Sequence, residues 1–307
     1  MSRKRKRKRR LSSPQDGAGK VTKSTTEAEA EEPRRGAVRA GLPPSPFPPL
    51  GISLTRGLQV VGSSPLVLAA AFLSLLATSW AFVALGVELT PRFLAVAMAI
   101  SPAHLFTDVP VAFSPTDVTG LLASVAGLAI LRSVTFSLLI ALIAQGLDGV
   151  PDFRAAVRRI GRPVLTVLAI YLLEVGLVVV VLQLFAAFLG QFAPLVVAAS
   201  IYFLAFVQVV AVMENTSLRT AFGLGTRAAR LPGLSHMSLV LLYYVVLSLA
   251  AAISPVLAPA TPSVLTWAFG LAMTFVHVGV LGALVFRWKE VRDQVTPASA
   301  PPGTDGA

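Results

Sequence analysis

The sequence predicts an all-α protein: a polytopic bundle of six transmembrane helices, with two cytoplasmic amphipathic helices and a disordered N-terminal tail. Three observations lead to this fold class. The 307 residues are 55% hydrophobic and only 13% charged, with a mean hydropathy of +0.75. Six long apolar stretches follow a polar first segment. The basic residues gather in the connections that would face one side of a bilayer.

The low charge content excludes an ordinary soluble domain. Such domains carry about 25% charged residues, and a larger core cannot replace them because the surface must still be wetted. Hydrocarbon is the alternative medium. The chain has no cysteine, which excludes disulfides, a thiolate nucleophile and a cysteine metal site.

The six apolar stretches are each long enough to cross about 30 Å of hydrocarbon at about 1.5 Å per residue. They are apolar throughout rather than alternating, and a span surrounded by lipid must satisfy its backbone internally, so helices are expected. The predicted spans are Pro65–Val87, Val118–Gln145, Val164–Leu189, Pro194–Met213, Met237–Leu257 and Val264–Phe286.

A shorter apolar segment lies between the first two spans. Residues 91–106 read PRFLAVAMAISPAHLF and contain Pro102. This length fits an interfacial or a re-entrant helix better than a span. A seventh span here would reverse the side of everything downstream, which the distribution of charge opposes.

The basic residues set the predicted orientation. With six spans and the N-terminus inside, 24 of the 26 Lys and Arg fall on the cytoplasmic side, in residues 1–64, 146–163, 214–236 and 287–307. Positive residues are retained on the cytoplasmic side of membrane proteins. Both termini are therefore expected in the cytoplasm. The net charge of +11 is explained by this orientation, and no nucleic-acid partner is predicted.

Three regions are expected along the chain. Residues 1–62 form a basic and proline-rich tail, residues 63–290 the transmembrane domain, and residues 291–307 a second tail. The tails have too few large apolar residues to offset the entropy of ordering, so disorder is predicted. The run SRKRKRKRR after Met1 is expected to bind anionic lipid headgroups, each basic residue contributing about 1 kcal/mol near the surface.

Two cytoplasmic connections resemble each other. Asp152 and Ser217 are residues typical of helix N-caps, and each is followed by the pattern apolar-Arg-x-Ala. Both connections are predicted to form amphipathic helices at the inner face, with arginines toward the headgroups. A duplicated span–helix–span unit is one explanation of the likeness, and chance similarity is the other. The membrane-surface basic residues would be Arg154, Arg158, Arg159, Arg219, Arg227 and Arg230.

Ionisable residues within spans are the candidate functional residues. Arg132 lies 14 residues before Gly146, and Glu174 lies 11 residues after Pro163. On antiparallel helices both would lie roughly 16–21 Å from the inner surface, where an ion pair would neutralise both charges. The pair would fix the packing of two spans or belong to a proton or substrate path. The remaining alternative is separate polar cavities, or a protonated Glu174.

His277 and Glu214 form a possible further polar site. His277 would either relay protons or, as is more common, hydrogen bond to a neighbouring helix. No second histidine or carboxylate lies three or four residues away, so no metal site is predicted. Glu214 ends the fourth span. No phosphate loop, HExxH or GxSxG motif is present, and no cofactor is predicted.

The layout resembles a group of uncharacterised prokaryotic six-span membrane proteins. The group includes the membrane domain that precedes the catalytic barrel of some bacterial glycerophosphodiester phosphodiesterases. The resemblance rests on residues 213–222, MENTSLRTAF, with Ser217 and Ala221 at the start of a helix, and on Asp152 and Ala156 at the same spacing. It implies a prokaryotic plasma membrane. The catalytic barrel is absent from this sequence, so phosphodiesterase activity is not implied.

Three functions remain after this reasoning. The first is a non-enzymatic scaffold, an assembly factor or a lipid-organising factor, with a membrane-protein partner or a homo-oligomer. The second is a small transporter or permease component that uses a cavity near Arg132, Glu174 and His277. The third is a lipid-acting enzyme, which needs an interfacial carboxylate or histidine cluster; the sequence offers only Glu214 near Arg219.

Overall fold

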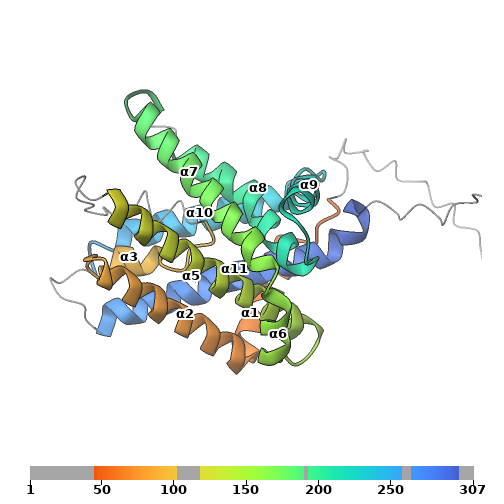
Figure 1. Cartoon of the computed structure of the whole chain (residues 1–307). Helices are drawn as coiled ribbons and strands as arrows, with labels where there is room; N and C mark the ends of the chain where they lie inside the picture. Colours follow the sequence, from red (N-terminus) through yellow and green to blue (C-terminus); the bar gives the residue numbers. More distant parts are fainter. Residues whose placement is uncertain (1–44, 102–117, 190–192, 258–263, 297–307) are drawn as a thin grey trace, which may run out of the picture. The chain divides into compact units, whose positions relative to one another are not determined.

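The computed structural model describes residues 45–101, 118–189, 193–257 and 264–296, and every regular element in these ranges is an α-helix (Figure 1). Four helices are long and apolar enough to cross a membrane. They are α2 (Pro65–Ala84), α5 (Val118–Asp148) from Ala126 onward, α10 (Ser235–Ile253) and α11 (Val264–Val295). The all-helical prediction is confirmed for these residues.

Three further helices contribute apolar segments. The short helix α6 (Phe153–Ile160) and the described part of α7 (Pro163–Leu189), up to Leu177, together form a fifth candidate span, bent by 63° between them. Helix α8 (Ala193–Met213) contributes a shorter described apolar stretch, Ala198–Met213. The structure therefore supports four or five spans by length and composition, and a count of six remains a prediction.

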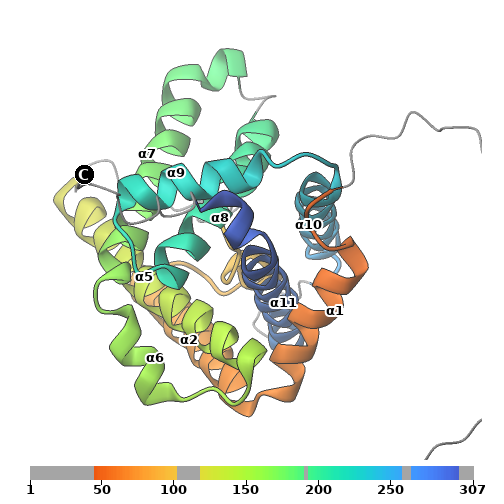
Figure 2. The same cartoon turned by 90° about the vertical axis from the view of Figure 1, so that its right-hand side faces the viewer.

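Helix α11 lies at the centre of the packing. It contacts α1 (Leu50–Ser63), α2, α3 (Pro91–Val96), α5, α8 and α9 (Leu218–Ala229). Figure 2 shows α11 nearly end-on, with α1 and α10 on one side of it and α5 on the other. Most side chains between Val278 and Val285 are buried, as expected for a helix that is surrounded by others.

Residues 50–62 correct the predicted boundary of the N-terminal tail. They form most of α1, with Ser53, Gly57 and Val60 buried on one face at helical spacing. Gly57 lies directly on α11, where an added Cβ would overlap the backbone of Gly279 and Ala283. The sequence prediction failed because small residues carry this contact, and small residues look like a linker. Residues 1–44 lie outside the described residues.

The predicted start of the C-terminal tail at residue 291 is also corrected. Helix α11 continues to Val295, and both Val291 and Val295 are buried. Residues 291–295 therefore belong to the folded part of the chain, because they add one more turn that packs apolar side chains. The prediction of a tail for residues 297–307 lies outside the described residues.

Both predicted connections form a helix, α6 and α9, but the two helices differ. Asp152 caps α6 by accepting a hydrogen bond from the Arg154 backbone N–H at 2.8 Å. Ser217 stands at the N-cap position of α9, but its Oγ faces Thr220 Oγ1 at 3.2 Å instead of capping the backbone. Helix α9 has 12 residues against 8 in α6, so the proposed duplication is at most approximate.

Helix α9 packs along α8 in the opposite direction. A Cβ on Gly225 would meet Val207, and the Tyr202 hydroxyl donates to the Ala229 carbonyl. Later residues of α9 therefore contact earlier residues of α8, as expected for two antiparallel helices. The missing side chain of Gly225 permits this approach.

Residues 91–101 enter the bundle. Helix α3 ends at Val96, and residues 97–101 are not helical. Every side chain from Phe93 to Ser101 is buried, and α3 packs on α10 and α11. A helix at an interface would leave one face exposed. The described part of residues 91–106 therefore fits a segment that enters the bundle, while residues 102–106 lie outside the described residues.

Candidate functional site

The break after α3 requires hydrogen-bond partners for its backbone. Residues 95–101, hereafter the core segment, are buried but leave the helical pattern after Val96. Buried backbone groups without partners are costly, most of all among apolar helices. Polar side chains from the surrounding helices supply these partners.

Arg132 on α5 binds two carbonyls of the core segment. Its guanidinium donates to Ala97 O at 2.6 Å and to Ala99 O, and its Nε lies 3.3 Å from the Tyr171 hydroxyl. The same group lies over the Phe136 ring, 5.0 Å from its centroid. An arginine donates from several directions at once, so one side chain can serve both carbonyls.

Tyr243 and His277 hold the other part of the core segment. The Ile100 N–H donates to the Tyr243 hydroxyl at 3.0 Å, and this hydroxyl lies 2.8 Å from His277 Nδ1. His277 Nε2 lies 2.7 Å from Ala95 O. A carbonyl can only accept, so Nε2 carries a hydrogen, and the neutral tautomer with Nδ1 as acceptor satisfies every contact. The predicted hydrogen bond from His277 to a neighbouring element is present.

Glu174 on α7 holds the end of the core segment through its side chain. Its Oε1 accepts from the Ser101 hydroxyl and, at 3.0 Å, from the Ser200 hydroxyl on α8. Its Oε2 is buried and has no hydrogen-bond partner among the described residues. One oxygen of this buried carboxyl group is therefore hydrogen-bonded, and the other is not.

The predicted direct pair of Arg132 and Glu174 is not formed. The ion pairs between side chains of the described residues are Lys289–Asp148 and Arg292–Glu214. Arg132 turns to backbone carbonyls and Glu174 to hydroxyls, so the two charges meet the same core segment without touching. The predicted direct contact is wrong because the sequence gave no sign that backbone carbonyls would lie between the two side chains. Their equal depth in a membrane stays a prediction.

Five helices thereby contribute to one polar cluster, hereafter the core cluster. Its side chains are Arg132 from α5, Tyr171 and Glu174 from α7, Ser200 from α8, Tyr243 from α10 and His277 from α11. The arrangement can fix the core segment, and Glu174 Oε2 can still take a proton or a ligand. No group of three or more metal-ligating side chains occurs among the residues the structure describes.

The candidate residues from the sequence did not include Tyr171, Ser200 or Tyr243 of the core cluster, nor Ser101 of the core segment. Serine hydroxyls are mild and frequent in apolar helices, so they gave no signal. Tyr243 did offer one, since tyrosine favours the ends of spans and this one stands in the middle of α10. A polar tip in the middle of an apolar helix needs a partner inside the protein.

Glu214 lies away from His277, in a separate contact between α8 and α11. Its Oε1 accepts from Trp288 Nε1 at 2.9 Å, and its Oε2 accepts from the Arg292 guanidinium at 2.9 Å. The predicted grouping of Glu214 with His277 as one polar site is therefore wrong, because the residues of α11 that Glu214 contacts lie 11 and 15 residues beyond His277. Glu214 instead fastens the end of α8 to the last turns of α11.

Arg287 is a second buried arginine that the sequence placed in a cytoplasmic segment. Its guanidinium donates to Ser53 Oγ at 2.9 Å and to the Ser235 carbonyl and hydroxyl, each at 2.8 Å. The Phe47 ring lies 5.6 Å away. Arg287 therefore joins the first turns of α1 and α10 to α11, a contact that no spacing along the chain could reveal.

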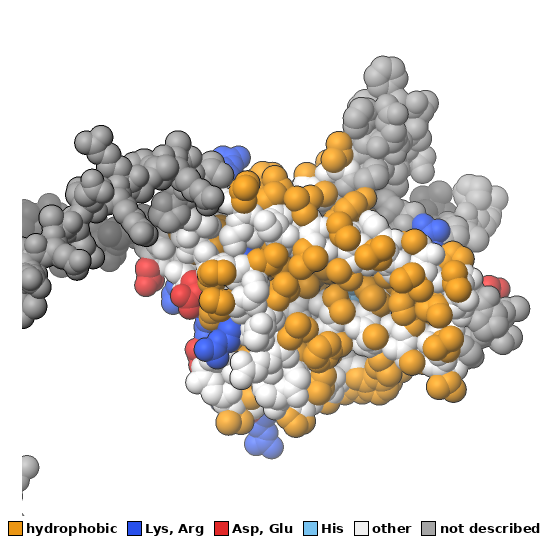
Figure 3. Space-filling model, turned by 180° about the vertical axis from the view of Figure 1, so that it is seen from behind, with side chains coloured by type: hydrophobic (Ala, Val, Ile, Leu, Met, Phe, Trp, Pro, Cys, Tyr) orange, Lys and Arg blue, Asp and Glu red, His pale blue; other side chains and the backbone are white. Residues whose placement is uncertain are grey.

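The remaining basic candidates lie at the surface. Arg154 and Arg158 are exposed on α6, and Arg159 donates to the Met213 carbonyl at 2.5 Å. On the other connection, the exposed residues are Arg219, Arg227 and Arg230. In Figure 3, apolar side chains cover the middle of the face shown, and charged side chains lie toward its margins. This distribution is typical of a membrane protein.

The cavities lined by described residues include an apolar groove and a charged cleft. The groove, of about 170 Å³, lies between α1, α10 and α11, and Tyr243 belongs to its wall. The cleft, of about 770 Å³, is open and includes Arg56, Asp148 and Lys289. Neither is lined by Arg132, Glu174 or His277. No family model, curated protein or solved structure matches this chain.

Proposed function

We propose that the chain is a non-enzymatic membrane scaffold that organises lipid or partner proteins at the cytoplasmic face of a prokaryotic plasma membrane. One observation carries this proposal. The side chains of Arg132 and His277 donate hydrogen bonds mainly to backbone carbonyls of the chain itself. These are the carbonyls of Ala95, Ala97 and Ala99. Polar groups used in this way stabilise a fold and are not available to bind a substrate.

The proposal assigns six spans, to α2, α5, α7, α8, α10 and α11. In support, α7 has 27 residues and α8 has 21, so each can cross about 30 Å at the helical rise. Reporter enzymes fused after Arg162 and after Arg230 test this assignment. Both fusions should report the side on which the N-terminus lies. A reporter on the opposite side at either position would refute the six-span topology.

Helix α6 is the proposed lipid-binding surface. Phe153 and Val157 are 48% and 44% exposed, one helical turn apart, and the exposed Arg154 and Arg158 stand beside them. Ala156 and Ile160 are buried against the protein. Apolar and basic side chains side by side favour the headgroup region, and each arginine contributes about 1 kcal/mol with anionic lipid. The proposed partners are therefore anionic lipid headgroups.

Spin-labelled lipids in vesicles of mixed phosphatidylcholine and phosphatidylglycerol test the lipid-organising role. The wild-type protein should immobilise more labelled phosphatidylglycerol than labelled phosphatidylcholine. The double variant Arg154→Gln with Arg158→Gln should lose most of this excess. Arg227→Gln with Arg230→Gln on the other connection is the matched control and should lose less. Equal immobilisation of both lipids by the wild-type protein would contradict the proposal.

The likeness to the membrane domain of bacterial glycerophosphodiester phosphodiesterases belongs to this proposal. Two features support it: Asp152 caps α6, and Ser217 stands at the start of α9.

A second candidate function is transport of a proton or a small cation. The observation that favours it is the buried Glu174 Oε2, which has no hydrogen-bond partner among the described residues. Intramembrane carboxylates mark ion pathways in many transporters. Proteoliposomes that carry a proton or sodium gradient decide the question. Faster dissipation by the wild-type protein than by Glu174→Gln would favour transport, and equal rates at the level of empty vesicles would exclude it.

A further inference from the structure

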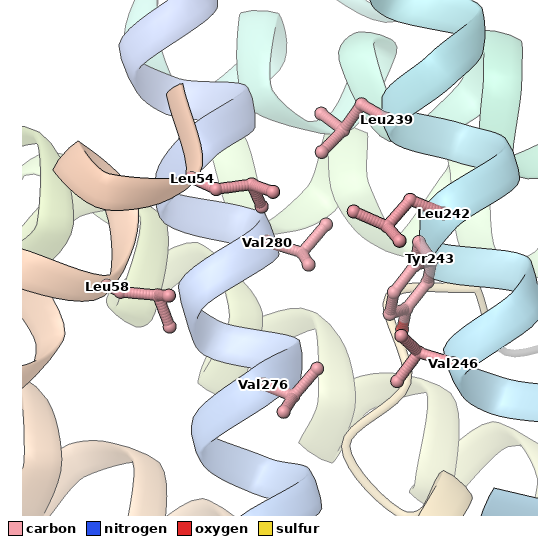
Figure 4. Close-up of a pocket in the computed structure, with 8 residues that line it drawn as sticks. All are labelled: Leu54, Leu58, Leu239, Leu242, Tyr243, Val246, Val276 and Val280. Carbon is pink, nitrogen blue, oxygen red and sulfur yellow. The ribbon is translucent and has the colours of Figure 1, made fainter. Parts of the chain in front are cut away.

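The apolar groove between α1, α10 and α11 shares one residue, Tyr243, with the core cluster. Figure 4 shows its eight lining side chains, of which seven are leucine or valine and the eighth is Tyr243. Leu58 and Leu242 at its rim are 37% and 40% exposed, whereas Leu239 and Tyr243 are buried. The groove therefore opens at the surface of the helix bundle beside Leu58 and Leu242, and its inner wall is buried.

The side chains that line the groove indicate which kind of molecule it can bind. The one polar group among the eight lining side chains is the Tyr243 hydroxyl, which is bonded to Ile100 N–H and His277 Nδ1. Water would find no free partner there, and an engineered apolar cavity of about 150 Å³ stays dry and binds hydrocarbon. The groove has about 170 Å³. This volume is too small to hold one turn of a second helix, whose diameter with side chains is about 10–12 Å.

The surface beside the groove indicates where a hydrocarbon occupant would come from. Leu241, Val245 and Leu249 lie on the outward side of α10 and are about half exposed, so the surface beside the groove is apolar. On the membrane assignment proposed above, this surface faces lipid. A single flexible chain can enter from it without desolvating any polar group.

We propose that the groove binds one hydrocarbon chain of a membrane lipid, and that its occupancy stabilises the core segment through Tyr243. The tyrosine ring forms part of the groove wall, and its hydroxyl holds Ile100 and His277. A chain packed against the ring restricts its motion, because side chains in dense packing lose rotamer freedom. Restriction of the ring then strengthens the two hydrogen bonds at its other end.

Photoreactive phosphatidylcholine with a diazirine in its acyl chain tests the binding step on the full chain. Labelling should appear on Tyr243 and Val246 themselves, resolved residue by residue from Val245 and Leu249, which lie on the outward side of α10. Leu242→Trp places a bulky side chain at the groove rim and should abolish this labelling. Leu241→Trp, one residue away and outside the groove, is the matched control and should retain it. Undiminished labelling of Leu242→Trp would overturn the binding site.

Hydrogen exchange of the Ile100 amide tests the coupling step. Adding phosphatidylcholine to delipidated protein should slow this exchange in the wild type and in Leu241→Trp. Tyr243→Phe should still be labelled but should lose the lipid effect on Ile100. Exchange that is insensitive to lipid in the wild type would overturn the coupling.

Two further outcomes have defined meanings. If Leu242→Trp fails to fold, Val246→Phe fills the groove from its other end and takes its place in both measurements. A crosslinked dimer that forms in the wild type and is lost in the groove variants, with no lipid labelling, would assign the groove to a second copy and overturn the proposal. Failure of the scaffold proposal would show instead in the spin-label experiment, which uses α6 and not this groove.

Discussion

Arg132 and Glu174 hold one stretch of chain from two different helices. Arg132 donates to the carbonyls of Ala97 and Ala99, and Glu174 accepts from the Ser101 hydroxyl. The two side chains are thereby joined through residues 97–101 and not by direct contact. An irregular segment offers carbonyls and hydroxyls that a regular helix would keep for itself, and buried charges need such partners.

Replacing Arg132 with Leu should lower the yield and thermal stability of the protein. The carbonyls of Ala97 and Ala99 would lose their donors, at about 1–3 kcal/mol for each buried group. Adding Glu174→Gln should restore part of the loss, because it removes the uncompensated charge but supplies no donor to the carbonyls. Unfolding in detergent measures both effects. The exposed Arg158→Leu is the control, and equal stability of single and double variants would contradict the coupling of charges.

Tyr243→Phe and His277→Phe should behave as a coupled pair. The Tyr243 hydroxyl lies 2.8 Å from His277 Nδ1 and also accepts from Ile100, so each variant removes a bond on which the other depends. A double-mutant cycle should give a coupling of about 1 kcal/mol, within the range for contacting residues. Thermal or denaturant unfolding of the four proteins provides the measurement. Strictly additive losses would mean that the bond contributes nothing.

Gly57→Leu should separate α1 from α11 and destabilise the protein. A Cβ at this position would come within 2.5 Å of the Ala283 nitrogen, and backbone atoms cannot move aside cheaply. Overpacking of this kind costs typically about 1–3 kcal/mol. Gly51→Leu, on the same helix with nothing within 4 Å of its Cβ, is a matched control. If thermal unfolding shows the two variants to be equally stable, the close crossing of α1 and α11 is wrong.

Glu214→Gln should loosen the last turns of α11 with little effect on global stability. Glu214 accepts from both Trp288 and Arg292, but the Arg292 side chain is 54% exposed, and such pairs contribute up to about 1 kcal/mol. Hydrogen exchange should rise in residues 288–295, and Trp288 fluorescence should shift to longer wavelength. The exposed Glu290→Gln should leave both unchanged. Unaltered exchange in Glu214→Gln would assign the stability of this end to apolar packing alone.

Part of the candidate site could be predicted from single residues. Arg132, Glu174 and His277 stand out because charged and titratable groups are rare in apolar stretches, and the structure brings all three to the core segment. Their partners could not be predicted. Three of them are alanine carbonyls, which every residue possesses, and a sequence does not show which carbonyls a helix leaves unpaired.

The sequence by itself determined the helical class, the apolar character of the long helices and the N-cap of α6 at Asp152, because periodicity and capping are local properties. Tertiary structure alone decided that residues 50–62 are a packed helix, that Arg287 is buried, and that Arg132 and Glu174 meet through a third segment. These outcomes depend on how closely backbones approach, as at Gly57 and Gly225, and on which carbonyls remain free. Both are properties of contacts between distant residues, and no local pattern encodes them.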